Sequence, residues 1–261
     1  MIKLMAHRGP GAFAKAIFEL RHYRAAKNML LRFDHPLDAG KRYLLAGGEY
    51  PAQVRVKTPL GVVEPVLYGY DDMLTLNEIF CRDDYRCPAD VRTIVDFGSN
   101  IGLSALYFLT RNSDVFAYLL EPLPRNAERL RTNLRGLESR YNFTQIAVAL
   151  EDGEAEFGYE ETGRYGGIGL AREKTTRVPC KAANKVLKEV LERHAFIDVL
   201  KIDIEALERE IVANIPFELL RRIRNIFVEL NPMFEGNPLP STHDYRRYGG
   251  VARFSLRCLQ N

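Results

Sequence analysis

The chain has 261 residues, of which 46% are hydrophobic and 27% are charged, and its formal net charge is +3. This length is enough for one substantial core with a small extra lobe, and the near balance of charge argues against nucleic acid as the main ligand. The four cysteines show no Cys-x-x-Cys spacing, which argues against structural zinc. Because no signal peptide and no apolar run of membrane-spanning length are visible, we expect a cytoplasmic protein with reduced thiols and no membrane partner.

The first third of the chain predicts a helix, a β-hairpin and a second helix. Apolar residues recur at helical spacing over residues 12–32, interspersed with basic residues. We interpret this segment as a packed helix with a solvated basic face; the alternatives are a membrane-surface anchor and a helix that shapes a binding pocket. A hairpin is expected from residues 54–57 and 62–67, and a short helix from residues 72–80.

The next stretch, from Arg92 to Leu109, predicts a strand that feeds a helix through a glycine-rich turn. Thr93, Ile94 and Val95 are strand formers in a short apolar run that ends at Asp96. Turn-forming residues follow, and then an apolar helix over residues 103–109; the turn comprises Gly98, Ser99, Asn100 and Gly102. Such a turn exposes backbone N–H groups and lets a ligand approach the main chain closely.

Strands and helices then alternate to the end of the chain, which is typical of an open, mostly parallel sheet flanked by helices. The expected strands are 115–120, 143–150, 155–159, one ending at 178, 197–204, 223–230 and 251–259; the expected helices are 126–137, 182–194 and 207–214. Residues 163–169 contain four glycines and are either a mobile lid or a plain hairpin tip. We therefore expect residues 1–90 to form an N-terminal helical and hairpin extension, and residues 91–261 to form a ligand-binding α/β domain.

The turn lacks the features of phosphate-binding loops. Asn100 stands where a dinucleotide fingerprint needs its middle glycine, and the Gly-Lys-Ser/Thr of a P-loop is absent. Asp96 suits a ligand with an ammonium group, and the neighbouring N–H groups suit a carboxylate. The amino-acid half of S-adenosylmethionine has both. Glu121 ends the next strand, where an acidic side chain can accept both ribose hydroxyls.

Four segments together resemble the FkbM family of S-adenosylmethionine-dependent methyltransferases. They are Val-Asp-Phe-Gly-Ser-Asn-Ile-Gly (95–102), Leu-Glu-Pro (120–122), Leu-Lys-Ile-Asp-Ile-Glu-Ala-Leu-Glu (200–208) and Val-Glu-Leu-Asn-Pro (228–232). The family pattern usually has glycine where Ala206 stands. The resemblance implies a Rossmann-like class I fold with seven strands, and methyl transfer, usually to a hydroxyl of a sugar or secondary metabolite.

Matching motifs in that family imply two sets of functional positions in this chain. The implied cofactor contacts are Asp96, Gly98, Ser99, Asn100, Gly102 and Glu121, with Asp203 and Glu205 as a cofactor or catalytic face. In class I folds the adenine is often held at the end of the third strand, here near residues 145–148, and we select Ala147.

Acidic residues near the ends of the later strands are the candidates for acceptor chemistry. An alcohol acceptor must lose a proton, so a general base within hydrogen-bond reach is useful. Asp203 and Glu205 are two apart in a predicted strand and should share a face, whereas Lys201 should point away and pair elsewhere. A helix-capping role is the alternative for Glu205. Crowding of the two acids would raise one pKa.

Two further residues, Glu229 and His243, complete the candidate set. Glu229 is a catalytic candidate, or else an ion-pair partner of Arg221, Arg222 or Arg224. His243 is a candidate base in a predicted polar loop, with a solvated surface histidine as the alternative. A divalent ion held by Asp203, Glu205 and Glu229 is an alternative that we do not expect.

The leading hypothesis is an O-methyltransferase for a small molecule or glycan. One alternative is an RNA or protein methyltransferase that uses the basic helix and the arginine cluster of residues 221–224. Another is a non-catalytic cofactor-binding domain. The sequence leaves open whether the chain forms a homodimer.

Overall fold

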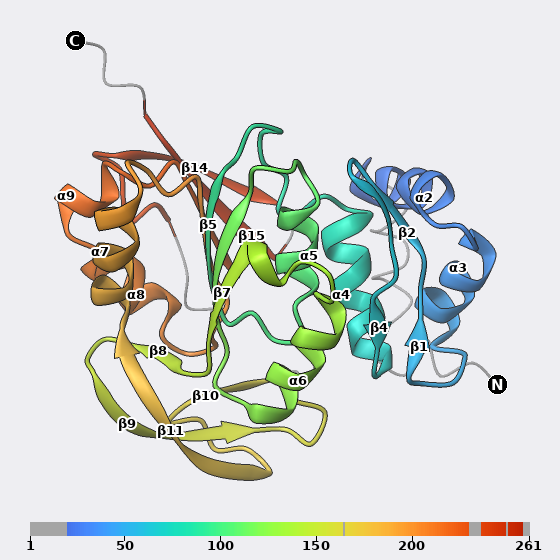
Figure 1. Cartoon of the computed structure of the whole chain (residues 1–261), viewed down its shortest axis with the longest axis horizontal. Coiled ribbons are helices and arrows are strands. Elements are labelled where there is room, and N and C mark those ends of the chain that lie inside the picture. The colour runs from blue at the N-terminus through green and yellow to red at the C-terminus, as the bar shows by residue number, and fades with distance from the viewer. Residues whose placement is uncertain (1–19, 164, 230–235, 249, 258–261) are drawn as a thin grey trace. The chain divides into compact units, whose positions relative to one another are not determined.

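The computed structural model describes residues 20–163, 165–229, 236–248 and 250–257, and the chain divides into two compact units, Met1–Arg86 and Cys87–Asn261 (Figure 1). Within the described residues, no helix combines the length and the hydrophobicity that a bilayer crossing requires.

The first unit contains three helices and four short strands in its described part. They are α2 (Leu20–Arg32), α3 (Pro36–Leu45), β1 (Ala52–Gln53), β2 (Val56–Thr58), β3 (Gly61–Val63), β4 (Val66–Leu67) and α4 (Tyr70–Phe80). The predicted hairpin is confirmed as β2 paired with β3, and β1 pairs with β4 beside it. Arg32 joins α2 to the end of α4, since its guanidinium donates to Phe80 O and pairs with Asp83, both at 2.6 Å.

The helix predicted over residues 12–32 is present as α2 from Leu20 onward, and residues 12–19 lie outside the described range. The sequence analysis missed α3, although Pro36 at its first turn is a recognised start signal.

The second unit is built on the predicted seven-stranded sheet, with strand order β14-β15-β13-β12-β5-β6-β7. Five strands run parallel, namely β5 (Thr93–Phe97), β6 (Phe116–Leu120), β7 (Tyr141–Thr144), β12 (Val199–Ile202) and β13 (Asn225–Glu229). An antiparallel hairpin, β14 (His243–Tyr248) with β15 (Val251–Leu256), completes the sheet. The fold class is therefore confirmed as a mostly parallel sheet with helices, as Figure 1 shows.

Helices cover the central strands, which explains why those strands carry apolar residues on both faces. The helices are α5 (Leu103–Leu109), α6 (Pro124–Asn133), α7 (Ala183–Arg193), α8 (Glu208–Asn214), α9 (Phe217–Leu220) and a 3-10 turn, η2 (Glu138–Arg140). Every residue of β5 and β12 is buried. Burial on this scale fixes the ends of β5 and β12 as rigid supports for the loops that follow them.

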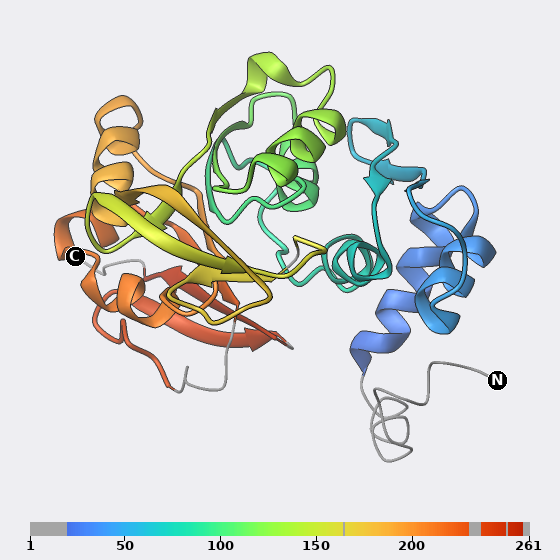
Figure 2. The same ribbon diagram turned by 90° about the horizontal axis from the view of Figure 1, so that it is seen from below.

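A second sheet, which we call the capping sheet, has strand order β10-β9-β11-β8. Its strands are β8 (Ala147–Ala149), β9 (Gly153–Tyr159), β10 (Gly166–Ile168) and β11 (Lys174–Ala182). Figures 1 and 2 show it lying across one end of the larger sheet. Its core includes Leu123, just beyond the carboxyl end of β6, so the capping sheet covers the edge where ligands of such folds bind.

The single strand predicted over residues 143–150 is wrong as one element, because β7 and β8 divide it between the two sheets. The glycine-rich residues 163–169 include β10, which pairs with β9. Gly167 fits closely against the backbone of Glu205, where a side chain would crowd the Glu205 carbonyl. The tip of the capping sheet is thus packed against the β12 end of the domain.

The chain turns sharply after β12. Glu205 and Ala206 both adopt left-handed backbone angles, with φ of 51° and 81°. Glycine is the residue that adopts such angles without steric cost. Ala206, which stands where the family pattern usually has glycine, is therefore strained beside the end of β12.

We expect Ala206→Gly to raise the free energy of unfolding by about 1 kcal/mol, because glycine relieves the left-handed strain. The melting temperature should rise by about 2–4 °C. The matched control is Ala195→Gly, at another exposed alanine that lies outside the left-handed region. That control should lower stability through the entropy of the unfolded chain, and equal losses in both variants would contradict the strain at Ala206.

Candidate cofactor site

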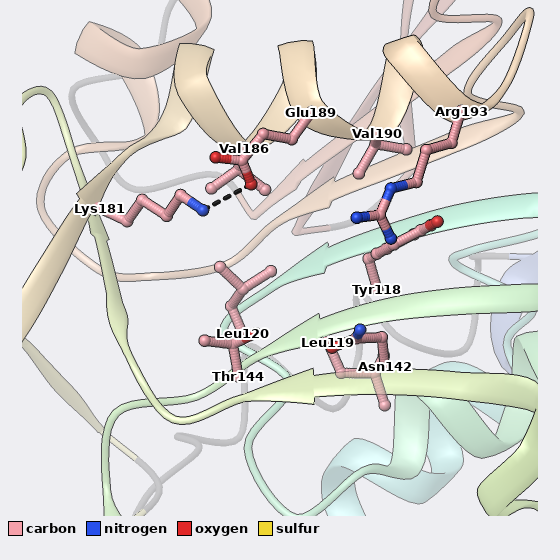
Figure 3. Close-up of a pocket in the computed structure, with 10 residues that line it drawn as sticks. All are labelled: Tyr118, Leu119, Leu120, Asn142, Thr144, Lys181, Val186, Glu189, Val190 and Arg193. Carbon is pink, nitrogen blue, oxygen red and sulfur yellow. Dashed lines mark hydrogen bonds and ion pairs between the residues drawn. The ribbon is translucent and has the colours of Figure 1, made fainter.

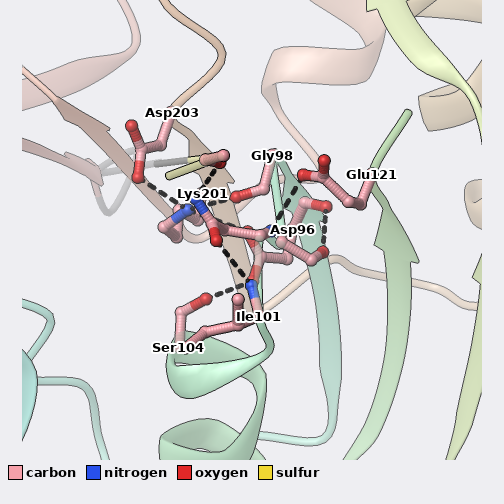
Figure 4. Close-up of polar contacts among 10 residues, drawn as sticks. Asp96, Gly98, Ile101, Ser104, Glu121, Lys201 and Asp203 are labelled. Carbon is pink, nitrogen blue, oxygen red and sulfur yellow. Dashed lines mark hydrogen bonds and ion pairs between the residues drawn. The ribbon is translucent and has the colours of Figure 1, made fainter. Parts of the chain in front are cut away.

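A buried acid, Asp96, lies near the carboxyl end of β5. Asp96 has no solvent exposure; one carboxylate oxygen accepts from Ser104 Oγ at 2.6 Å and the other from Lys201 Nζ at 3.1 Å (Figure 4). The ammonium of Lys201 therefore lies where the ammonium of a ligand was expected. A contact between Asp96 and a ligand stays a prediction.

The turn after β5 uses glycine where the backbone comes close to the next strand. Gly98 has φ of 80°, and a Cβ at this residue would overlap the carbonyl oxygen of Asp203. Its N–H and that of Ser99 both donate to Leu120 O at 3.0 Å, so these groups are not directed at a ligand carboxylate as expected. Gly102 is also left-handed, and its Cα faces Leu130 on α6. The turn is thus shaped by contacts with both neighbouring strands.

Glu121 holds the turn from the end of β6. Its Oε2 accepts from the N–H of Asn100 at 3.0 Å, and its Oε1 accepts from Leu123 N and Asn126 Nδ2, both at 3.1 Å. A carboxylate has about four acceptor positions, so Oε2 retains capacity for a ribose hydroxyl. Burial raises the pKa of Glu121 to about 7, although these three donors oppose the shift. The acid therefore changes charge near neutral pH.

The tip of the capping sheet contacts two asparagines that bond Glu121, namely Asn126 and Asn100. Asn126 Nδ2 also donates to Gly163 O at 2.8 Å, and Asn100 Nδ2 lies 3.5 Å from the same oxygen. Asn100 tolerates its left-handed φ of 48° because its short side chain bonds locally, here to Ile101 N at 2.7 Å. Ala147, selected for the adenine, is buried in the same cluster as Leu123, which lies two residues after Glu121. Its role in binding adenine stays a prediction.

The side chain of Lys201 points in a direction that the sequence analysis did not predict. It was expected to point away, but its Nζ lies 3.1 Å from Asp96 Oδ1, 3.0 Å from Asp203 Oδ2 and 3.0 Å from Gly98 O. Burial lowers the pKa of Lys201, but Asp203 and Asp96 together outweigh burial and raise it above the ordinary value. Lys201 therefore stays charged, and it lies beside Asp96 because the two residues are in register on adjacent strands.

Asp203 and Glu205 follow β12, which ends at Ile202, so they are not alternate residues of one strand as predicted. The Asp203 side chain is 28% exposed and the Glu205 side chain is 24% exposed. Glu205 pairs with Arg172 of the capping sheet loop at 3.1 Å, and Arg172 also contacts Glu160 at 3.3 Å. Burial raises the pKa of Glu205, while Arg172 opposes the shift.

Glu208 belongs to the same group of acids, and the candidate set omitted it. It opens α8, is only 3% exposed, and burial raises its pKa to about 7, with Asp203 and Glu205 adding to the increase. The spacing Asp-x-Glu-x-x-Glu was the signal that could have identified it. The alternative that Glu205 caps a helix is not supported, since Leu207 is the cap residue of α8.

The structure separates the last two candidates. Glu229 is exposed at the carboxyl end of β13, and the arginines proposed as its partners precede the other end of that strand. His243 is fully buried and bonds Ile223 O through Nε2 at 3.0 Å. It pairs with Leu256 in the sheet, at the edge opposite the acids, so its assignment as a catalytic base is wrong. The surface alternative for His243 is also wrong, because β14 replaces the predicted loop.

Across the described residues, no group of three or more histidine, cysteine or acidic side chains is arranged to hold a metal ion. Asp203, Glu205 and Glu229 therefore do not form the cluster that the metal alternative required.

A recess lies on the face of the larger sheet beside α7 (Figure 3). It is lined by Tyr118, Leu119, Leu120, Asn142, Thr144, Lys181, Val186, Glu189, Val190 and Arg193. Lys181 and Glu189 pair across one end at 2.6 Å. None of the predicted site residues lines this recess.

Comparison with known proteins places these features in a family. A family model described as the methyltransferase FkbM domain matches residues 96–249. The AMB antimetabolite synthetase AmbE of Pseudomonas aeruginosa is 24% identical over an alignment of 209 residues, and the match covers 65% of this chain and 10% of that protein. The chain thus spans about a tenth of the length of this curated relative.

The chain is also similar to solved structures, at low identity. Methyltransferase FkbM from Methylobacillus flagellatus KT is 12% identical, with a TM-score of 0.41, over 90% of this chain and 59% of that one. TrmK of M. capricolum, solved with S-adenosylhomocysteine, is also 12% identical, with a TM-score of 0.36, over 70% of this chain and 68% of that one. Because the family model spans more than half of the sequence, the chain belongs to the FkbM methyltransferase family, and its second unit is a class I, S-adenosylmethionine-dependent methyltransferase domain.

Proposed function

We propose that this chain transfers the methyl group of S-adenosylmethionine to a hydroxyl of a small molecule, as a sugar or secondary-metabolite O-methyltransferase. The observation that carries the proposal is the pair of partly exposed carboxylates, Asp203 and Glu205, directly beside the turn after β5. Methyl transfer to an alcohol needs placement of the acceptor and removal of its proton, and carboxylates at this position can serve both.

The cofactor in this proposal lies across the carboxyl ends of β5 and β6. Glu121 accepts ribose hydroxyls, Asp203 accepts the ammonium of the amino-acid portion, and Ala147 lies beside the adenine. Bound there, S-adenosylmethionine supplies an electrophilic methyl group. Glu205 has a pKa above its ordinary value because of burial, which favours its acting as the base toward an acceptor hydroxyl.

The contacts that the arginines of residues 221–224 make within the domain favour a small-molecule acceptor over RNA. Arg222 donates to the carbonyl oxygens of Leu191 and His194, and Arg224 pairs with Asp198 at 2.8 Å. These guanidinium groups are engaged within the domain. The name of the relative AmbE, an antimetabolite synthetase, also points to small-molecule chemistry.

The proposed activity is tested by incubating the chain with methyl-labelled S-adenosylmethionine and separate panels of hydroxylated small molecules, RNA and proteins. We expect label in an ether-linked methyl group of a small molecule. Label in RNA or protein alone would replace the proposal with the macromolecular alternative. Cofactor binding without transfer to any panel would favour a non-catalytic domain.

Affinity for S-adenosylhomocysteine should fall as the pH drops below 7, because ribose hydroxyls bind the ionised form of Glu121, whose pKa is about 7. The decrease should approach about tenfold per pH unit, measured by calorimetry between about pH 5.5 and 8. The unliganded domain should respond in the opposite sense. The folded pKa of Glu121 exceeds the ordinary 4.5, so its contribution to stability is present at low pH and is lost as the pH rises through 7.

Glu121→Gln should bind S-adenosylhomocysteine more weakly and with little dependence on pH. The control is Glu208→Gln, since Glu208 also has a pKa of about 7 but lies on α8. This control should keep the wild-type pH dependence. A flat wild-type profile, or one that only Glu208→Gln abolishes, would remove Glu121 from the cofactor site.

Glu205→Gln should lower kcat by about 100-fold or more, because a neutral amide cannot accept the acceptor's proton. The affinity for S-adenosylhomocysteine should change little. Glu160→Gln is the matched control, because Glu160 is the other acid that contacts Arg172. It should retain most of kcat. Equal losses in both variants would assign the effect to the position of Arg172, and no loss at Glu205 would exclude it as the base.

A further inference from the structure

Lys201 is a buried cation that connects the two central strands at the cofactor edge. Its side chain is 4% exposed, and three acceptors lie within 3.1 Å of its Nζ: Asp96 Oδ1, Asp203 Oδ2 and Gly98 O. An ammonium group has three N–H donors, and these contacts supply three acceptors for them. The two carboxylate oxygens lie no more than about 6 Å apart, a separation at which like charges repel unless a cation lies between them.

The two carboxylates differ in their access to solvent. Asp96 is sealed within the core, and its second oxygen accepts from Ser104. The Asp203 side chain is 28% exposed and extends from the turn after β12, as Figure 4 shows. Lys201 therefore has a fixed anchor on one side and a carboxylate at the edge of the site on the other.

The backbone alone does not fix the Asp203 side chain. The N–H of Asp203 donates to Phe97 O at 3.0 Å, and its carbonyl faces Gly98, which sets the main chain. The carboxylate follows the end of a regular strand, so its orientation depends on the groups that contact it. The Lys201 contact supplies that restraint at Oδ2.

We propose that Lys201 is a positioning residue that holds Asp203 in the orientation that receives the ammonium of the cofactor's amino-acid portion. This inference rests on the proposed cofactor site. Lys201 acts through Asp203 and does not contact the ligand itself. Two carboxylates and one ammonium give the group a net charge of −1, so Asp203 remains an anionic acceptor without leaving a second unpaired charge in the core.

The test uses a double variant, Lys201→Met with Asp96→Asn, and two ligands. Removing the lysine alone would take away the cation between two neighbouring carboxylates, which is strongly destabilising. The double variant keeps the net charge at −1, now on Asp203 alone, and so isolates the loss of positioning. The ligands are S-adenosylhomocysteine and 5′-methylthioadenosine, which shares the nucleoside and thioether but lacks the amino-acid portion. Thermal unfolding confirms that the variants are folded.

We expect the double variant to lose about tenfold or more in affinity for S-adenosylhomocysteine, and to bind 5′-methylthioadenosine within about threefold of wild type. Adding Asp203→Asn should cause little further loss, since both changes act on one contact. Equal losses for both ligands would reduce Lys201 to a structural role, and unchanged affinity for both would also overturn the proposal. Failure of wild type to bind either ligand would instead refute the cofactor site.

Discussion

The close approach of the β5 and β12 ends is the constraint on which this domain depends. Gly98 lies against the carbonyl of Asp203, and the Lys201 ammonium joins Asp96 of β5 to Asp203, which follows β12. A larger residue at Gly98 would force the strand ends apart and separate the charges. Strand packing and charge placement at this edge are thus set by the same contact.

The acids at this edge of the sheet differ in how deeply they are buried. Asp96 is sealed and paired, Glu121 is buried but bonded only to neutral donors, and Asp203 and Glu205 are partly exposed. Lys201 pairs with Asp96 inside the core, whereas burial raises the pKa of Glu121 to about 7 against the pull of its neutral donors. The domain therefore carries structural acids inside and chemically available acids outside, within a few residues of one another.

Much of this fold follows from the sequence, because buried parallel strands appear as short apolar runs and end in recognisable acids. The strand-turn-helix after β5 and the acids after β6 and β12 are visible in the sequence in this way. Lys201 was misplaced because alternation was misapplied: residues two apart in a strand share a face, so Lys201 belongs on the side of Asp203. Register then puts it beside Asp96. The strand β14 was missed because its outward residues are polar, which resembles a loop, and His243 was misassigned with it. The division of residues 143–150 between two sheets depends on tertiary packing, which a local apolar pattern does not reveal.

In sequence, the capping sheet follows β7 directly and is followed directly by α7. Both of its ends are thus joined to rigid parts of the domain, and its tip also contacts the domain. Gly163 O accepts from Asn126 on α6, Gly167 packs against the backbone of Glu205, and Arg172 pairs with Glu205. For protein engineering, a change of length or sequence in this tip is therefore tolerable where these three contacts are kept.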